Sequence, residues 1–362
     1  MYFAIINAKP VNKLPQIYGI LLALLTVGLH FLSGRLFPGM TELLYLHFIY
    51  VVVKWVLWPL TVWPVSAFSI FAGFVFIIFG FWVYRAFQMK FSIWKFSLGV
   101  LNVAGLLIGL FYLNWGFNYS LPKMVERLGW DVPEYEASRI SSLYASVTHE
   151  MLSARKDWVE EGTGSPNLDE DFIRSEVGRI QKAWLIEKDL YVSVPAQIRP
   201  LPKGLLLRIS TAGFYFPFGG EGYWDAGLHD LVVPFVMAHE LAHNYGITDE
   251  GEANFIAFHT CIQSEHAFIR YCGYLNFWRY VARQFRYMDP EGFEKEWACL
   301  SDTIKNDLIQ IHEQHDLYPD ILPQVRDVIY DTFLRAQGVQ SGLESYAEVV
   351  KLELAYRALE NH

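Results

Sequence analysis

Apolar stretches dominate the first third of the chain. Three of them approach the roughly 20 residues that a helix needs to cross the hydrocarbon layer of a bilayer. They are 17–32, 65–84 and 96–117. A fourth stretch, 43–63, is also apolar, but it contains Lys54 and Pro59, and its Trp and Tyr residues suit the headgroup region. We therefore predict three membrane-spanning helices and one interfacial or re-entrant helix, with a fourth span as the alternative.

Beyond residue 117 the apolar positions recur mostly at helical spacing. The segment 134–158 shows this pattern most clearly. Its apolar positions are Ile140, Leu143, Tyr144, Val147 and Met151. The runs 204–210 and 213–226 differ, because they are rich in aliphatic and aromatic residues and punctuated by Gly and Pro, which predicts short strands. The expected fold is α+β: a membrane anchor (1–116), then a mainly helical domain with a small β-sheet (117–362).

Composition and charge agree with this division. Hydrophobic residues make up 53% of the chain, and its mean hydropathy is +0.20. The first 117 residues carry seven Lys or Arg and one acid, whereas the remainder carries 22 basic and 37 acidic residues. A domain this acidic argues against nucleic acid as a partner, and the chain has no glycine-rich phosphate loop that would indicate a nucleotide. The expected partners are the lipid bilayer and a peptide or protein substrate.

The basic residues of the anchor also predict its orientation. Lys9 and Lys13 precede the first expected span, while Arg85, Lys90 and Lys95 lie between the second and the third. With three spans, all five lie on one side of the membrane, which the positive-inside rule assigns to the cytoplasm. The domain after residue 117 is therefore expected to face the periplasm or the exterior.

The sequence HELAH, 239–243, suggests a metal centre. Pro234 suits the first turn of a helix and Gly246 suits the residue just past its end, so His239 and His243 should project from one helical face. Two imidazoles at this spacing can bind one Zn²⁺, and Glu240 between them can act as general base toward the metal's water. The alternative is a helix whose histidines are merely packed in the core.

A third ligand is expected just beyond the glycine. The segment after Gly246 reads as a second helix that folds back on the first, with Asp249 as its N-cap and Glu252 at the third position. We predict Glu252 as the third metal ligand, rather than Asp249, Glu250 or His259. The alternative role of Glu252 is to complete a capping box with Asp249.

Other residues are weaker candidates. The glycine pair Gly219 and Gly220 would allow a substrate to approach the backbone, and Glu221 or Tyr223 could contact it; an ordinary core strand explains these residues equally well. A donor that stabilises the oxyanion is also needed. The candidates are Tyr330, Tyr346 and His312.

Several motifs together carry a resemblance to a known family. They are NWGFNY (114–119), FPFGGEGYWD (216–225), PFVMAHELAHNYG (234–246) and EANFIAF (252–258). The chain resembles a bacterial domain-of-unknown-function family of membrane proteins with N-terminal transmembrane helices and an H-E-x-x-H domain, regarded as zinc-dependent peptidases. The resemblance implies a zincin-like domain, a gluzincin-like site with His, His and Glu ligands, and a location in the bacterial inner membrane.

The function expected from these observations is hydrolysis of amide bonds by a membrane-anchored metallopeptidase with one catalytic Zn²⁺. Two other classes remain open: a catalytically silent, membrane-tethered binding or sensing module, and a zinc amidase acting on cell-wall or lipid-linked substrates. Intact Glu240 argues against the silent module.

Overall fold

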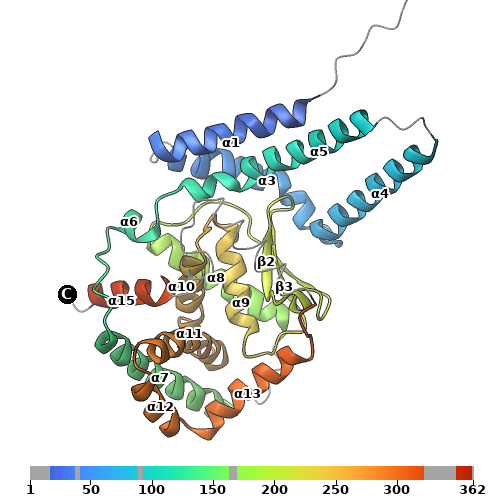
Figure 1. Cartoon of the computed structure of the whole chain (residues 1–362). Helices are drawn as coiled ribbons and strands as arrows, with labels where there is room; N and C mark the ends of the chain where they lie inside the picture. Colours follow the sequence, from blue (N-terminus) through green and yellow to red (C-terminus); the bar gives the residue numbers. More distant parts are fainter. Residues whose placement is uncertain (1–16, 37–40, 89–92, 163–168, 322–347, 361–362) are drawn as a thin grey trace, which may run out of the picture.

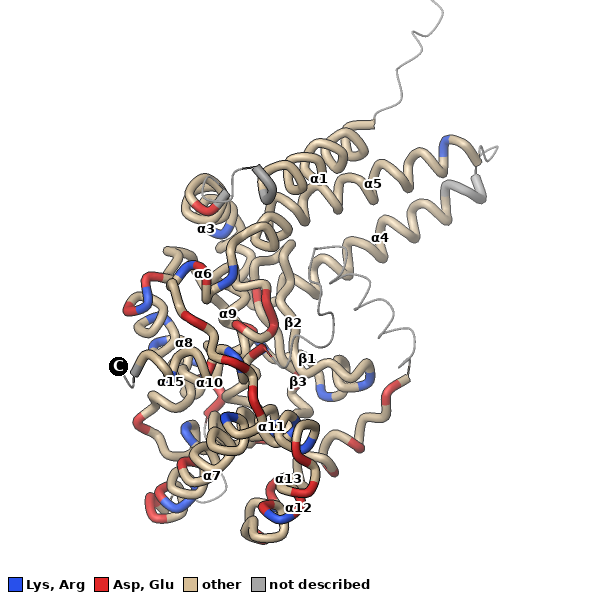
Figure 2. The backbone as a smooth tube through the Cα atoms, turned by 60° about the vertical axis from the view of Figure 1, so that its left-hand side comes forward, with Lys and Arg blue, Asp and Glu red and all other residues tan. Residues whose placement is uncertain are grey.

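A computed structural model describes residues 17–36, 41–88, 93–162, 169–321 and 348–360 of the chain. The apolar helices of the first third lie together at one end of the molecule, and the mainly helical remainder lies at the other (Figure 1). Lys, Arg, Asp and Glu are sparse in the described part of the apolar helices and frequent in the remainder (Figure 2). The expected α+β class is confirmed, with apolar N-terminal helices and one small sheet.

Five helical segments form the apolar end. They are α1 (Tyr18–Leu36), η1 (Thr41–Tyr50), which is a π-helix, and α3 (Val51–Thr61), α4 (Ala67–Gln88) and α5 (Ile93–Asn114). By length and composition, three stretches among the described residues could cross a membrane: Glu42–Thr61, Ala67–Tyr84 and Ile93–Asn114; the apolar helix Tyr18–Ser33 is shorter. These helices suggest a membrane protein that contacts a lipid bilayer.

Glycines allow α1 and α5 to pack closely and in parallel. The Gly19 amide donates to Asn102 Oδ1 at 2.8 Å, and a Cβ at Gly105 would lie 2.7 Å from the Gly19 backbone. Further along both helices, the His30 ring lies 4.9 Å from that of Tyr112. Because residues further along α1 contact residues further along α5, the two helices run in the same direction. Small residues at such an interface are typical of membrane helices.

The remainder of the chain is built mainly from helices. They are η2 (Gly116–Ser120), α6 (Met124–Leu128), α7 (Ala137–Glu160), α8 (Glu170–Glu187), η3 (Leu207–Ile209), α9 (Val233–Asn244), α10 (Glu250–Ile262), α11 (Ala267–Met288), α12 (Pro290–Cys299), α13 (Asp302–Asp316) and α15 (Glu348–Glu360). The predicted periodicity of α7 is confirmed, because the apolar positions expected to face the core are all buried. Helices α9, α10 and α11 pack around a shared core that includes Met237, Phe255 and Phe277.

The sheet has three short strands, β1 (Ile198–Leu201), β2 (Gly213–Phe216) and β3 (Glu221–Asp225), in the order β1-β3-β2. Strand β1 is parallel to β3, and β2 is antiparallel to it, with Tyr215 opposite Gly222. Strands in the run 213–226 were predicted correctly. Strand β1 was not predicted, because IRPL is too short to show a period.

The strand predicted at 204–210 is wrong, because a buried carboxylate bends this segment into turns and the short helix η3. Asp225 accepts hydrogen bonds from the amides of Gly204, Leu206, Leu207 and Gly227 at 2.7 to 3.1 Å. Bound to both oxygens of one side chain, these amides cannot pair with a neighbouring strand. The loop is therefore held against the end of β3.

Candidate metal centre

Helix α9 carries the two histidines as predicted. Pro234 lies in its first turn, and Gly246 beyond its end has a φ of +90°, a conformation that glycine adopts without strain. The rings of His239 and His243 lie 4.8 Å apart, and their Nε2 atoms are 3.1 Å apart. The i, i+4 spacing thus brings both Nε2 atoms to one point.

Both rings are oriented by partners at the opposite nitrogen. His239 Nδ1 lies 2.9 Å from Asn254 Oδ1, and His243 Nδ1 lies 2.7 Å from the Ile247 carbonyl oxygen. Each of these oxygens accepts a hydrogen bond from Nδ1–H, which leaves Nε2 as the donor atom for a metal. Asn254 and Ile247 are thus part of the site, and sequence reasoning did not identify them.

Glu250, the first residue of α10, completes the cluster. Its Oε2 lies 3.2 Å from His239 Nε2, and the ligand atoms of His239, His243 and Glu250 all lie within 4.8 Å of one another. Tetrahedral ligands about 2.0–2.1 Å from a zinc ion would be roughly 3.4 Å apart. Two of the three spacings, 3.1 and 3.2 Å, are close to that value, and the third is at most 4.8 Å. The three residues could therefore hold a metal ion.

Glu252, the predicted third ligand, lies elsewhere. Its Oε1 accepts a hydrogen bond from the Met124 amide at 2.6 Å, and its side chain is buried on the side of α10 that faces α6. Burial is the main cause that raises the pKa of Glu252 to about 8, with the charge of Asp249 adding to it. The structure brings Glu250, and not Glu252, to the two histidines.

The remaining acids and histidines near the turn have structural partners. Asp249 caps α10 as predicted, because its Oδ1 accepts from the amides of Gly251 and Glu252. His259 lies deep in the core, where its Nε2 is 2.8 Å from Glu353 Oε2. Both residues therefore stabilise the fold.

Glu240 is buried between α9 and the sheet. A Cβ at Gly213 would lie 2.6 Å from its Oε1, and one at Gly222 would lie 3.2 Å from its Cβ. A side chain at position 213 would therefore clash with the carboxylate, and one at position 222 would push Glu240 by a few tenths of an ångström. Its Oε2 is buried and has no hydrogen-bond partner among the described residues. An unpaired buried carboxylate oxygen is costly in a purely structural residue, which favours a chemical role.

The charges of the site are tightly linked in the absence of a metal. Burial raises the pKa of Glu240 to about 8, with the charge of Glu250 adding to the effect. Burial by itself lowers the pKa of His239, but the hydrogen bond to Glu250 and the charge of Glu240 outweigh it and raise that pKa to about 9. Burial and the charge of His239 lower the pKa of His243 to about 4. His239 therefore holds a proton more readily than His243 does.

Residues of the apolar end form one wall of the site. The Trp115 ring lies 6.0 Å from that of His243 and 4.5 Å from that of Tyr215. Lys54 Nζ donates to the Gly220 carbonyl oxygen at 2.6 Å and to Asn244 Oδ1 at 3.0 Å. Sequence reasoning placed Lys54 at a membrane surface and did not connect it with the metal centre.

The other predicted site residues lie apart from the cluster. Glu221 is fully buried and pairs with Arg199, and Tyr223 donates to Glu221, so both hold the sheet to the start of α4. His312 is exposed on α13 and pairs with Asp316. Tyr330 and Tyr346 lie outside the described residues.

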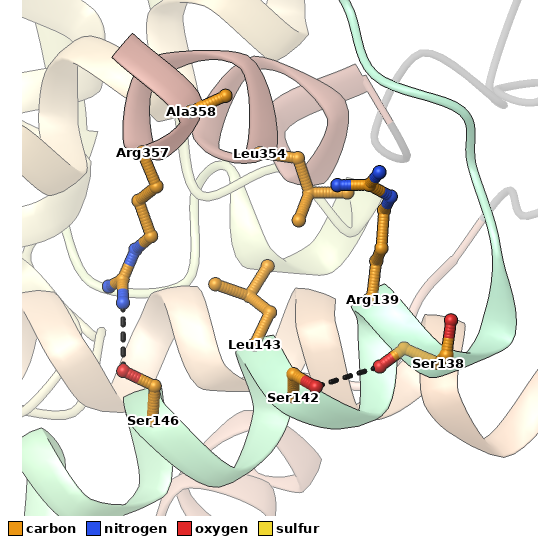
Figure 3. Close-up of a pocket in the computed structure, with 8 residues that line it drawn as sticks. All are labelled: Ser138, Arg139, Ser142, Leu143, Ser146, Leu354, Arg357 and Ala358. Carbon is orange, nitrogen blue, oxygen red and sulfur yellow. Dashed lines mark hydrogen bonds between the residues drawn. The ribbon is translucent and has the colours of Figure 1, made fainter. Parts of the chain in front are cut away.

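A separate cavity of about 390 Å³ lies between α7 and α15 (Figure 3). Ser142 and Ser146 line it from α7, and Arg357 reaches it from α15 and donates to Ser146. None of its lining residues belongs to α9 or α10. The cavity is therefore distinct from the metal centre.

Comparison with known proteins places the chain in a family. Residues 45–354 match the family described as "Protein of unknown function (DUF3810)". The chain belongs to the DUF3810 family. No curated protein and no solved structure matches it. The DUF3810 match includes the candidate metal-site residues and the part of the expected anchor from residue 45 onward, and it leaves out α1.

Proposed function

We propose that this DUF3810 protein is a membrane-anchored, zinc-dependent peptidase that hydrolyses amide bonds. The observation that carries the proposal is the position of Glu240, a buried carboxylate with an unpaired oxygen, between two histidines whose Nε2 atoms converge with Glu250. Two imidazoles and one carboxylate form a donor set typical of catalytic zinc sites, which keep a fourth position open. Zinc bound there would lower the pKa of a water molecule and polarise a carbonyl group.

The protein's own residues would handle the proton and the substrate. Glu240 accepts a proton at its carboxylate from the attacking water, as the water oxygen bonds to the carbonyl carbon. When the carbon–nitrogen bond breaks, Glu240 passes that proton to the leaving amine, so the products are a carboxylic acid and an amine. Burial, which raises the pKa of Glu240, helps the carboxyl group to hold the proton between the two steps.

Strand β2 offers a support for a peptide substrate. Within the described part of the chain it is an edge strand, paired with β3 alone, and Gly213 at its start lies against Glu240. An extended peptide could add to this edge through main-chain hydrogen bonds, which would align its carbonyl groups beside the cluster. This arrangement favours a peptide over the cell-wall amidase alternative.

The first prediction tests the role of Glu240. Glu240→Gln keeps the size of the side chain but cannot accept the proton, so we expect cleavage of a peptide library to fall by about 100- to 10,000-fold. Bound zinc, measured by elemental analysis of the purified full-length chain, should stay near one equivalent. Equal cleavage by the wild type and the variant would contradict the peptidase proposal.

A further inference from the structure

The metal centre lies next to the end of an apolar helix that could cross a membrane. Helix α5 ends at Asn114, the following residue is Trp115, and the Trp115 ring is 6.0 Å from that of His243. A helix that spans the hydrocarbon layer ends in the headgroup region, which is roughly 5–8 Å deep on each side of a bilayer. If α5 spans the membrane, His243 therefore lies at about the depth of the headgroups.

The segment 41–61 lies along the domain instead of leaving it. Near its start Glu42 pairs with Arg127 at 2.9 Å, and at its end the Thr61 carbonyl oxygen accepts a hydrogen bond from Arg199. Between them, the Tyr50 hydroxyl donates to the Asn244 carbonyl oxygen at 2.9 Å. A helix whose two ends both contact the same water-exposed domain does not cross a bilayer. This geometry favours the interfacial position that the sequence predicts.

The segment 41–61 has two opposite faces. One face is buried against the domain and contains Leu46, Tyr50 and Lys54. The other face is exposed and apolar, with Leu44, Phe48, Val52 and Val56 at intervals of four residues. Because this apolar face continues from helices long enough to span a membrane, the bilayer itself is the partner that fits it.

The turn that carries the metal ligands is held directly against this segment. A Cβ at Gly246 would lie 2.8 Å from Leu46, and Lys54 bonds to Asn244, the last residue of α9. The turn between His243 and Glu250 is thus separated from the bilayer by a single layer of helix. With this segment lying on the bilayer, the candidate metal centre is positioned close to the membrane surface.

We infer that the substrate is a polypeptide held in the bilayer by an apolar anchor and cut within about four residues of that anchor. An extended chain advances roughly 3.3 Å per residue, so two residues reach the depth of His243 from the hydrocarbon boundary, and four exceed the headgroup layer. This inference rests on the proposed function, since it names the class of substrate for the same site.

The test uses the full-length, zinc-loaded chain in phosphatidylcholine vesicles. The probe is a random peptide cassette attached to an anchor, either directly or through a rigid spacer of about ten prolines that extends roughly 3.1 Å per residue. A palmitoyl chain and a model apolar helix serve as anchors in separate arms. Because both cassettes share one anchor, their local concentrations match, and only their distance from the membrane differs.

We expect the direct cassette to be cut about tenfold faster or more, with mass spectrometry placing the cuts within about four residues of the anchor. Cleavage in only one arm would identify the anchor as acyl or helical. Equal rates with and without the spacer would overturn the inference and leave the peptidase proposal standing. Absence of cleavage from both cassettes, with zinc still bound, would overturn both.

A second measurement does not depend on activity. Thr248 is partly exposed in the turn before Glu250. Cys299 is exposed at the end of α12, a helix that lies at the opposite end of the molecule from the apolar helices (Figure 1). A spin label on Thr248→Cys, with Cys299→Ser, should show the accessibility to oxygen that is typical of the headgroup layer. The same label on Cys299 of the unaltered chain should show that of water, because Cys261 and Cys272 are buried. Water-like values at both positions would contradict the inferred depth.

Discussion

At the scale of single residues, the centre depends on which carboxylate of the turn faces the histidines. Glu250 and Glu252 are two positions apart, so they point to nearly opposite sides of α10. Glu250 faces His239, and Asn254, four residues later on the same face, binds the same ring. Glu252 faces α6 and accepts from the Met124 amide. The rotation of α10 about its axis therefore selects the ligand.

This arrangement predicts different outcomes for three neighbouring acids. Glu250→Ala should remove one of three ligands and lower zinc binding well below one equivalent. Glu252→Gln keeps an oxygen for the Met124 amide and should retain the metal. Asp249→Ala removes the cap of α10 and should cost about 1 kcal/mol of stability while zinc stays bound. Zinc content and thermal unfolding of the three purified variants are the measurements.

A different result would favour Glu252, the ligand predicted from the sequence. If zinc stayed bound in Glu250→Ala and was lost in Glu252→Gln, the ligand would be Glu252, and α10 would have to turn about its axis when the metal binds.

At the scale of elements, the loop before β2 is organised by one buried carboxylate. Asp225 binds four backbone amides, so the loop 204–210 cannot form the strand that its composition predicts. Asp225 is the last residue of β3, so these hydrogen bonds connect the loop to the central strand of the sheet. The same sheet supports Glu240, which means that the stability of the loop and the geometry of the site are connected.

We therefore expect Asp225→Asn to destabilise the protein by about 2–4 kcal/mol. The asparagine carbonyl oxygen can still accept, but its NH2 nitrogen cannot, so at least one buried backbone amide loses its acceptor, and a charge-assisted network is lost. Chemical denaturation in detergent measures the change. Asp302, whose side chain is fully exposed in the first turn of α13, provides the control, and Asp302→Asn should change stability by less than about 0.5 kcal/mol.

At the scale of the whole molecule, the apolar helices and the domain are joined through the metal centre. Lys54 and Tyr50 from the segment 41–61 bind Asn244, and Trp115 from the end of α5 packs near His243. The apolar helices thus contribute side chains to the candidate metal centre, in addition to anchoring the domain. Removing residues 1–116 to obtain a soluble domain would also remove the hydrogen bonds of Lys54 and Tyr50 and the packing of Trp115.

The direction in which the domain faces is a prediction at this scale. Three crossing helices, with 41–61 lying at the surface, place the positively charged loops on one side and the domain on the other. A reporter that is active only outside the cytoplasm, fused after His362, should therefore be active. Activity of a cytoplasmic reporter at the same position would instead mean that the segment 41–61 is a fourth span, or that three spans have the reversed orientation.

The sequence by itself determined the features that depend on local periodicity. The helix with His239 and His243, the cap at Asp249, the buried positions of α7 and the apolar character of the first third all follow from spacing within one or two turns. Such patterns are set by 3.6 residues per turn and by backbone amides that need an acceptor, so neighbouring residues suffice to predict them.

Only the tertiary structure decided which residues meet across long separations. The Met124 amide donates to Glu252, and the amide of Leu206, in the loop before β2, donates to Asp225. Lys54 donates to Asn244, which is 190 positions away in the sequence. None of these pairings leaves a periodic signal, because each depends on how packed elements are rotated and placed relative to one another. The rotation of α10 about its axis decides which carboxylate of its first turn faces the histidines, and the packing of distant side chains fixes that rotation.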